Sequence, residues 1–324
     1  MIGEEKLNDE LFWVQDLRKM CPTCHQPRKD IATVHDDGFS FHWLVAEKPN
    51  VRMIDETQIR DFEDHLSGVS GTIITHARCD SLTRFVAIGD FTPSPNIISN
   101  KPKYKIGRPT LTLPVDIDKI VSGCDRIFAN NLYENLHDKI YPLPLGFCRK
   151  EITDFIHLRQ KDKENFCYAN FSLTQKYRFN VLQWAAVQDD IDCHFTKRFP
   201  DWDDQIDDKY FSEPLPFDEF ISTLASYKFC IAPNGVGIDT DRLWECIFLN
   251  TVPIVQNNYG NRVFSKIWPM ILVDRYEFAD IPKLAEEFET QHGECIQYNH
   301  DLLLRKNLPE LLDRIEYECK RLDE

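Results

Sequence analysis

The chain has little of the material from which membrane spans, secretory leaders and nucleic-acid-binding surfaces are made. No stretch of its 324 residues approaches the run of roughly 20 apolar side chains that a membrane helix needs. The N-terminus, MIGEEKLNDELFWV, is charged where a secretory signal has an apolar segment. Acidic residues number 53 against 38 basic ones, and the resulting net charge of −15 repels phosphate backbones. We therefore expect a cytoplasmic protein with no transmembrane segment and no nucleic-acid partner.

Metal and disulfide patterns are also sparse. The 11 cysteines are scattered singly apart from one Cys-x-x-Cys pair, which indicates free thiols in a reducing compartment. That pair, in CPTCH (21–25), has zinc-knuckle spacing, but a site with four ligands would have to recruit His35 or His42. The acidic run DWDDQIDD (201–208) could bind a hard cation, although a solvated loop is the simpler interpretation. We expect no metal site.

What the sequence does contain is apolar material for well-packed cores. Hydrophobic residues make up 42% and aromatic residues 12%, which argues against disorder. The length predicts two domains of about 150 residues each. A charged connector, CRKEITDFIHLRQKDKEN (148–165), divides the chain into an N-terminal half, residues 1–150, and a C-terminal half, residues 151–324. In the N-terminal half, short apolar strands are expected at 39–46, 72–75, 84–90, 125–131 and 139–147.

The C-terminal half alternates strands with helices. Strands are expected at 166–172, 228–233, 252–256 and 270–274, and helices at 174–187, 217–227 and 239–250. The end of the chain has apolar positions at helical spacing. This alternation is typical of an open, doubly wound parallel sheet, so we expect an α/β fold. Ligands of such sheets bind at the carboxyl ends of the strands.

One segment, APNGVGIDTDRLWECIFLNTVPIV (232–255), places a glycine-containing loop between a strand and a helix. Gly235 and Gly237 permit backbone conformations and close approaches that other residues forbid. Asp239 or Thr240 could cap the following helix, and a helix start offers free N–H groups to phosphate. The loop and the helix start are therefore a candidate site for an anionic ligand.

Arg242 and Glu245 lie three positions apart on one face of that expected helix. A cation beside a diphosphate, with a carboxylate that accepts from ribose hydroxyls, would need this arrangement. The alternative is a pair of helix-surface charges beside an ordinary turn. The spacing alone does not separate the two.

The same segment is similar to the signature of exostosin-like glycosyltransferases. That signature pairs a Pro-x-Gly loop with a later Arg, a Trp-Glu or similar pair, and a Pro-Ile-Val strand. Further segments resemble the family in the same order along the chain: ITHARCDSL (74–82), RIFANNLYENLHDKIYPLPLGF (126–147), YANFSLTQKYRF (168–179) and MILVDRYEF (270–278). This order is more specific than any single motif, and the resemblance covers the stretch from residue 70 to residue 280.

The resemblance implies two Rossmann-like domains facing a cleft, the GT-B arrangement. The N-terminal domain would lie on the acceptor side, and the C-terminal domain would bind a nucleotide diphosphate sugar. Arg242 would face the diphosphate and Glu245 the ribose. The rest of the candidate donor-binding set is Asn170, Ser172, Arg178, Pro233, Asn234, Gly235, Gly237, Asp239 and Thr240.

The chain departs from the family pattern at two positions. Asn234 stands where an Arg is common after the Pro, which removes a cation that could meet phosphate. Asn250 stands where a Gly is common before the last strand of the signature. The first departure leaves the identity of the donor open.

The expected reaction is transfer of a sugar from a UDP- or GDP-sugar to a hydroxyl of a glycan or glycoconjugate, without a further cofactor. For an inverting transfer, which we expect, a base must take the proton of the attacking hydroxyl. Asp80 and His76, from the N-terminal half, are the candidate catalytic residues, and Asp90 and Asp37 are the second choice. The sequence does not itself distinguish inversion from retention.

Two other interpretations stay open. One is a non-catalytic glycan- or nucleotide-binding protein with a degenerate transferase fold. The other is a fucosyltransferase-like enzyme that uses GDP-fucose. The α-1,3-fucosyltransferases have a comparable acid-rich loop, Trp and Val-Pro-Val strand, but their Glu-Asn and Thr-Glu-Lys pattern is absent here. An epimerase would need a Gly-x-Gly-x-x-Gly turn near its start, and this sequence has none there.

Overall fold

The computed structural model describes the strands at 43–46 and 72–76 as backbone only, and most of the chain from residue 121 on. The later described ranges are 121, 125–129, 131–132, 134–147, 149–173, 176–196, 210–235, 237–304 and 307–322. The strand expected at 84–90 therefore lies outside the described residues, as do CPTCH and the acidic run at 201–208.

The first sheet has four strands in the order β1-β2-β3-β4. Its strands are β1 (Trp43–Ala46), β2 (Thr72–His76), β3 (Arg126–Ala129) and β4 (Ile140–Pro142). β1 runs antiparallel to β2, whereas β2, β3 and β4 are parallel to one another. The carboxyl ends of these three parallel strands therefore meet at one edge of the sheet.

The second sheet has five strands, all parallel, in the order β6-β5-β7-β8-β9. The strands are β5 (Asn165–Ser172), β6 (Ile191–Thr196), β7 (Tyr227–Ile231), β8 (Val252–Gln256) and β9 (Ile271–Val273). The predicted α/β class with parallel sheets is confirmed.

Helices cover both faces of the second sheet. They are α6 (Lys176–Ala185), α7 (Phe217–Leu224), α8 (Asp241–Phe248) and α10 (Ile281–His292). Side chains alternate across a strand, so Phe171 of β5 packs in one core with α6 and α10. Tyr168 of the same strand packs in the other core with α7 and α8. Each strand of the sheet interior is thus buried on both sides, as a parallel sheet requires.

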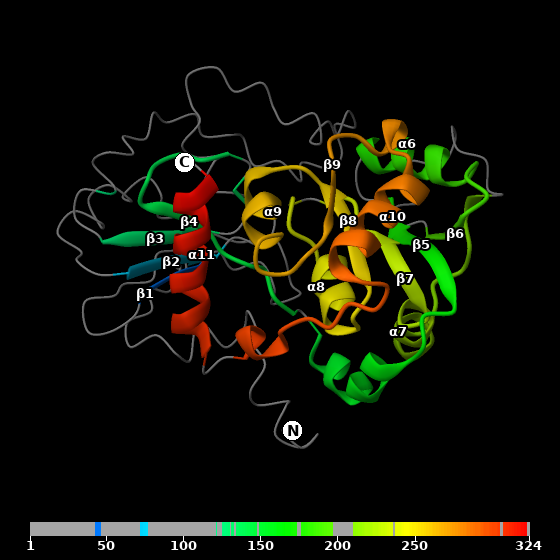
Figure 1. Cartoon of the computed structure of the whole chain (residues 1–324), viewed down its shortest axis with the longest axis horizontal. Helices are drawn as coiled ribbons and strands as arrows, with labels where there is room; N and C mark the ends of the chain where they lie inside the picture. The colour runs from blue at the N-terminus through cyan, green and yellow to red at the C-terminus, as the bar shows by residue number, and fades with distance from the viewer. Residues whose placement is uncertain are drawn as a thin grey trace, which may run out of the picture.

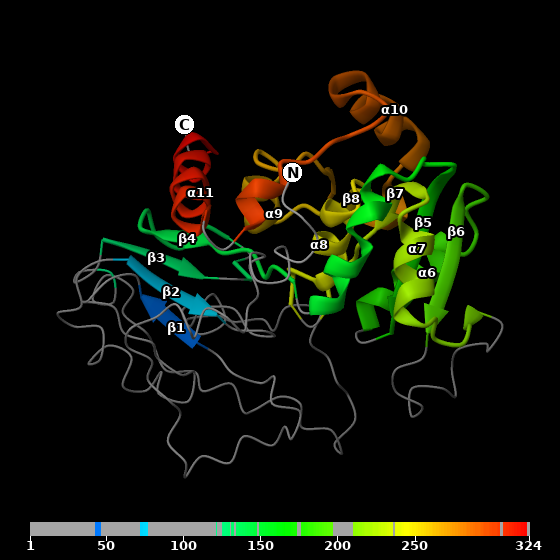
Figure 2. The same ribbon diagram turned by 90° about the horizontal axis from the view of Figure 1, so that it is seen from below.

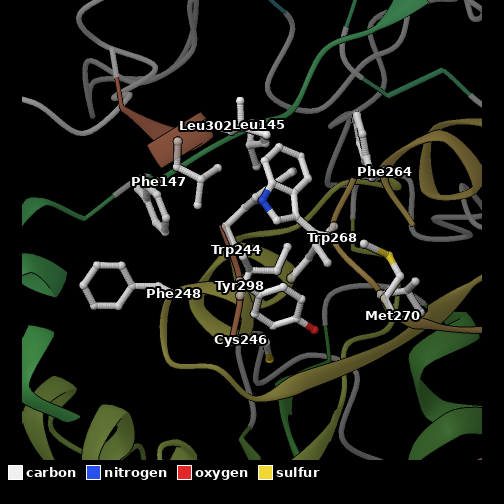
Figure 3. Packing of buried hydrophobic residues seen from close by; sticks show 14 of the residues in the cluster. Leu145, Phe147, Trp244, Cys246, Phe248, Phe264, Trp268, Met270, Tyr298 and Leu302 are labelled. Carbon is white, nitrogen blue, oxygen red and sulfur yellow. The ribbon is translucent and has the colours of Figure 1, made fainter. Parts of the chain in front are cut away.

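The core beside α7 and α8 extends to the first sheet. It joins Ile127 and Phe128 of β3 to Trp244 and Phe248 of α8 in one buried cluster. Figure 3 shows Leu145, which follows β4, in the same cluster as Trp244 and Trp268. The two indole rings pack edge to face, with centroids 5.3 Å apart. In Figure 2 the first sheet lies on one side of α8 and α9 (Tyr259–Phe264), and the second sheet lies on the other.

The last helix, α11 (Leu308–Leu322), returns to the first sheet. Figure 1 shows it in red beside β4, although it follows the second sheet in the chain. The Arg126 guanidinium of β3 lies 2.5 Å from Asp313 and 3.0 Å from Glu316 of this helix. Among the described helices, none is both long and apolar enough to cross a membrane.

The remaining elements are the 3₁₀ segments η3 (Lys150–Gln160), η6 (Tyr276–Phe278) and η7 (His300–Leu303). The sequence did not predict β6 or α9. In β6, IDCHFT, only Ile191 and Phe195 are buried, because β6 is an edge strand and presents polar side chains to solvent. α9 is a short helix, capped by Asn258, whose side chain accepts a hydrogen bond from the backbone N–H of Asn261.

Candidate functional site

The site begins at the point where the strand order reverses. β5 has β6 on one side and β7 on the other. The connection after β5 leads to β6, and the connection after β7 leads to β8, so the two leave the sheet in opposite directions. In open α/β sheets this switch point, at the carboxyl ends of the strands, is where ligands bind. Asn170 and Ser172 lie at that end of β5, and Pro233, Asn234 and Gly235 follow β7. The fold therefore brings these predicted residues together.

Arg178, in the first turns of α6, joins the two loops at the switch point. Its Nε donates to the carbonyl of Asn234 at 2.8 Å, and its Nη2 to that of Pro233 at 3.0 Å. Its Nη1 donates to the carbonyl of Ser172 at 2.9 Å. A Cβ on Gly235 would lie 3.1 Å from Nη2, so the glycine leaves room for the guanidinium. Arg178 thus holds the shape of the loop after β7.

Arg242, in the first turn of α8, forms a largely buried ion pair with Glu245. The Nε–Oε2 distance is 3.0 Å, and the side chains are 16% and 12% exposed. The Arg242 Nη1 also donates to the carbonyl of Asn170 at 2.6 Å, and both Nη atoms lie within 3.4 Å of its Oδ1. The guanidinium covers the ring of Phe220 at 4.1 Å. Burial raises the pKa of Glu245, and the adjacent Arg242 counters that effect. The pair is not an ordinary pair of surface charges.

The helix start is arranged differently from the expectation. Thr240 occupies the N-cap position of α8, but its side chain makes no capping hydrogen bond. The Asp239 carboxylate instead reaches the N-terminal half, where it accepts from the backbone N–H of Leu145 at 2.5 Å. Its other oxygen accepts from the Trp244 Nε1–H at 2.7 Å. Asp239 is 4% exposed, and its burial raises the pKa to about 7.

Gly237 approaches another protein segment closely. A Cβ at this position would lie 2.5 Å from Oδ1 of Asn131, a residue that follows β3. The backbone N–H of Asp239 donates to that same Oδ1 at 3.0 Å. The open space that the glycine provides is thus filled by a side chain of the N-terminal half. Sequence reasoning missed Asn131, although RIFANN marked the end of a strand there.

Asn234, the first departure from the family pattern, is buried at 3% exposure. Its Nδ2 donates to Oε1 of Gln256, at the end of β8. Its Oδ1 is buried and has no hydrogen-bond partner among the described residues. The position at which an Arg is common in the resembled family thus carries a carboxamide joined to the neighbouring strand.

Asn250, the second departure, has a conformational explanation. Its φ is +57°, in the left-handed region where glycine is the usual residue and asparagine the next most tolerant. Its side chain is also fully used, because Nδ2 donates to the Arg159 carbonyl at 3.2 Å and to Oε1 of Gln297 at 3.0 Å. Its Oδ1 accepts from the Tyr298 N–H at 3.1 Å. Asparagine is therefore compatible with a left-handed backbone at this position.

Of the candidate catalytic residues, His76 is the last residue of β2. It is placed at the same edge of the first sheet as the loops that follow β3 and β4, since these strands are parallel. Asp80, Asp90 and Asp37 lie outside the described residues. Within the part of the chain that the structure describes, no three His, Cys, Asp or Glu side chains are grouped to hold a metal ion.

A pocket of about 140 Å³ lies at the opposite end of the second sheet. Its basic side chains donate hydrogen bonds at the carboxyl ends of helices. Lys163 donates to the carbonyls of Ala225 and Leu249, after α7 and α8, and to the Thr251 hydroxyl. Lys161 donates to the carbonyl of Ser222 at 2.9 Å. Burial lowers the pKa of Lys163 to about 8. These cations satisfy carbonyls that α7 and α8 leave unpaired, so the pocket has a structural explanation.

Comparison with protein families and with curated proteins gives no match. Among solved structures, a spinosyn rhamnosyltransferase complexed with spinosyn aglycone is 11% identical at a TM-score of 0.26 and covers 50% of this chain and 46% of that one. The N-terminal domain of Candida albicans trehalose-6-phosphate phosphatase is 9% identical at a TM-score of 0.31 and covers 63% and 57%. The matches span about half the length of those structures. TM-scores this low establish no shared fold.

Proposed function

We propose that this chain is a glycosyltransferase that moves a sugar from a nucleotide diphosphate sugar to a hydroxyl of a glycan or glycoconjugate. The observation that carries the proposal is the cluster of Arg242, Glu245 and Asn170 at the switch point of a parallel sheet. The order of motifs that resembles exostosin-like glycosyltransferases supports the same activity. In this proposal the two halves, residues 1–150 and 151–324, form the GT-B arrangement, with the donor on the second.

Arg242 is the proposed partner of the diphosphate. A guanidinium carries a permanent positive charge and five N–H donors in a planar fork, a geometry that suits the oxygens of a phosphate. Its low exposure strengthens an interaction with a phosphate oxygen, because few water molecules compete for it. As the bond to the sugar breaks, negative charge grows on the leaving diphosphate, and a fixed cation stabilises that charge.

Glu245 is the proposed partner of the ribose. It uses Oε2 for the ion pair with Arg242, which leaves Oε1 to accept from a ribose hydroxyl. The ion pair also fixes the carboxylate at one place on α8. Arg178 supports the site indirectly, because its contacts hold the Pro233–Gly235 turn beside the end of β5.

The base of an inverting transfer is proposed to come from the N-terminal half, with Asp80 and His76 as the candidates. The carboxyl edge that ends at His76 also carries the loops after β3 and β4 that touch the glycine loop of the second half. A base in that position would face the donor from the acceptor side. The arrangement is testable with alanine at both positions.

The test is calorimetric binding of UDP and GDP, followed by assay of sugar release from UDP- and GDP-sugars. We expect Arg242→Gln and Glu245→Gln to lose nucleotide affinity and to remain folded. Arg126→Gln is the matched control. Arg126 of β3 forms an ion pair with Glu316 of α11 that is similarly exposed, at 19% and 24%, and this pair lies outside the switch point. Unchanged UDP and GDP affinity in both site variants would overturn the site. Failure of the wild type to bind either nucleotide would favour the non-catalytic alternative.

A further inference from the structure

The glycine loop between β7 and α8, residues 232–240, is held by contacts with the N-terminal half as well as by contacts within the C-terminal half. Asn131, two residues beyond the end of β3, has a φ of +59° and is 4% exposed. This left-handed conformation is uncommon outside glycine and asparagine. It directs the carboxamide so that Oδ1 accepts the backbone N–H of Asp239 at 3.0 Å, a contact between residues 108 apart in the chain.

The fit between Asn131 and Gly237 leaves no room for a side chain. A Cβ on Gly237 would lie 2.5 Å from Oδ1, 2.9 Å from Cγ and 3.0 Å from Nδ2 of Asn131. Within the loop, the Gly235 N–H donates to the Gly237 carbonyl at 2.8 Å, which closes a tight turn. The turn and the carboxamide therefore determine each other's position.

The Asp239 carboxylate makes the second contact between the halves. It accepts from the Leu145 N–H, in the loop after β4, and from the Trp244 Nε1–H of α8. Trp244 itself is completely buried in the core that joins both sheets. A third contact lies nearby, where the Gly260 N–H of α9 donates to the Leu132 carbonyl at 3.1 Å.

We propose that Asn131 and Asp239 are positioning residues that fix the glycine loop in its ligand-binding shape by joining it to the loops after β3 and β4. The inference rests on the proposed function, since the loop is the candidate donor site. It follows that donor binding by the second half depends on contact with the first. Arg178 holds the start of the same loop through the Pro233 and Asn234 carbonyls, so loss of the Asn131 contact frees its other end.

The experiment compares Asn131→Gly with Asn250→Gly. The two asparagines match closely: each is 4% exposed, each has a φ near +58° (+59° and +57°), and each makes buried hydrogen bonds through its carboxamide. Glycine keeps the backbone conformation and removes the side chain in both. UDP and GDP affinity, the thermal midpoint and hydrogen exchange of the loop amides are measured for each.

We expect both variants to lower the thermal midpoint, because each loses buried hydrogen bonds. Only Asn131→Gly is expected to weaken nucleotide binding, by about tenfold, which corresponds to ~1.4 kcal/mol. Only that variant is expected to speed exchange of the Gly235 and Asp239 amides. Equal nucleotide affinity in the two variants, with equal exchange, would overturn the proposal.

Gly237→Ala, made alone and together with Asn131→Gly, supplies a second test. The added Cβ clashes with the Asn131 carboxamide, and Asn131→Gly removes that clash. The double variant is therefore expected to be more stable than Gly237→Ala alone, and a double variant that is no more stable contradicts the fit. If the wild type binds neither UDP nor GDP, the proposed function fails, and the exchange rates alone then decide whether the contact holds the loop.

Discussion

Asp239 is the group through which pH is expected to act on the stability of this fold. Its burial raises the carboxyl pKa from 3.8 to about 7, and the nearby Asp241 adds to the increase. The hydrogen bonds from Leu145 and Trp244 act in the opposite direction and do not cancel it. A carboxyl with a higher pKa in the folded state binds its proton more tightly there than in the unfolded chain. The contribution of Asp239 to the free energy of unfolding therefore falls as pH rises from 3.8 toward 7, and it is constant above that range.

The magnitude follows from the two pKa values. The difference between 3.8 and about 7 corresponds to ~4 kcal/mol in the free energy of unfolding. Roughly 2–3 kcal/mol of this falls between pH 5 and pH 8, because the unfolded carboxyl is already largely ionised at pH 5. Asp239→Asn removes the ionisation and turns an amide N–H₂ toward one of the two donors, at a pH-independent cost of about 1–3 kcal/mol.

The assay is urea unfolding of the wild type and of Asp239→Asn from pH 5 to pH 8. We expect the free energy of unfolding of the wild type, relative to that of Asp239→Asn, to be larger at pH 5 than at pH 8. Asp313→Asn is the control, since Asp313 is 68% exposed and pairs with Arg126 on the surface. Parallel pH profiles for the wild type and Asp239→Asn would refute the assignment of a buried, high-pKa carboxyl to the contact between the halves.

Three further substitutions test the packing around the site. Gly235→Ala places a Cβ 3.1 Å from Nη2 of Arg178 and is expected to lower the thermal midpoint and weaken nucleotide binding, because Arg178 must shift. Lys163→Met is expected to destabilise the fold by about 1–3 kcal/mol, measured by urea unfolding, since buried carbonyls after α7 and α8 lose their donor; nucleotide affinity should not change. Asn250→Ala is expected to be less stable than Asn250→Gly by about 1 kcal/mol, because only the alanine is strained at a φ of +57°; equal thermal midpoints for the two would contradict this.

Much of the second half follows from local patterns. The strands β5, β7, β8 and β9 are short apolar runs, and α6, α7 and α8 begin and end within a few residues of the periodic segments that predicted them. Edge strand β6 escaped prediction because its polar side chains face solvent, and α9 because a short helix in an asparagine-rich segment has little periodicity. Elements such as these depend on position in the fold more than on composition.

In the candidate site, too, some features follow from local sequence and others depend on the fold. Local spacing placed Arg242 and Glu245 on one face of α8, and their ion pair is present. It also marked Gly235 and Gly237 as positions of close approach, but the atoms that approach them belong to Arg178 and Asn131. The capping role expected of Asp239 or Thr240 is not realised, because the Asp239 carboxylate bonds instead to Leu145, 94 residues away in the chain. A pattern of neighbours in sequence contains no record of such distant partners.

By itself, the sequence determined the α/β alternation, the absence of long apolar runs, and the segment in which glycine, arginine and glutamate lie together. These properties depend on a few residues of local periodicity. The tertiary structure alone decided the strand order that creates the switch point, the return of α11 to the first sheet, and the use of Asn131 to hold the glycine loop. These depend on which distant surfaces bury each other, and burial is a property of the whole chain.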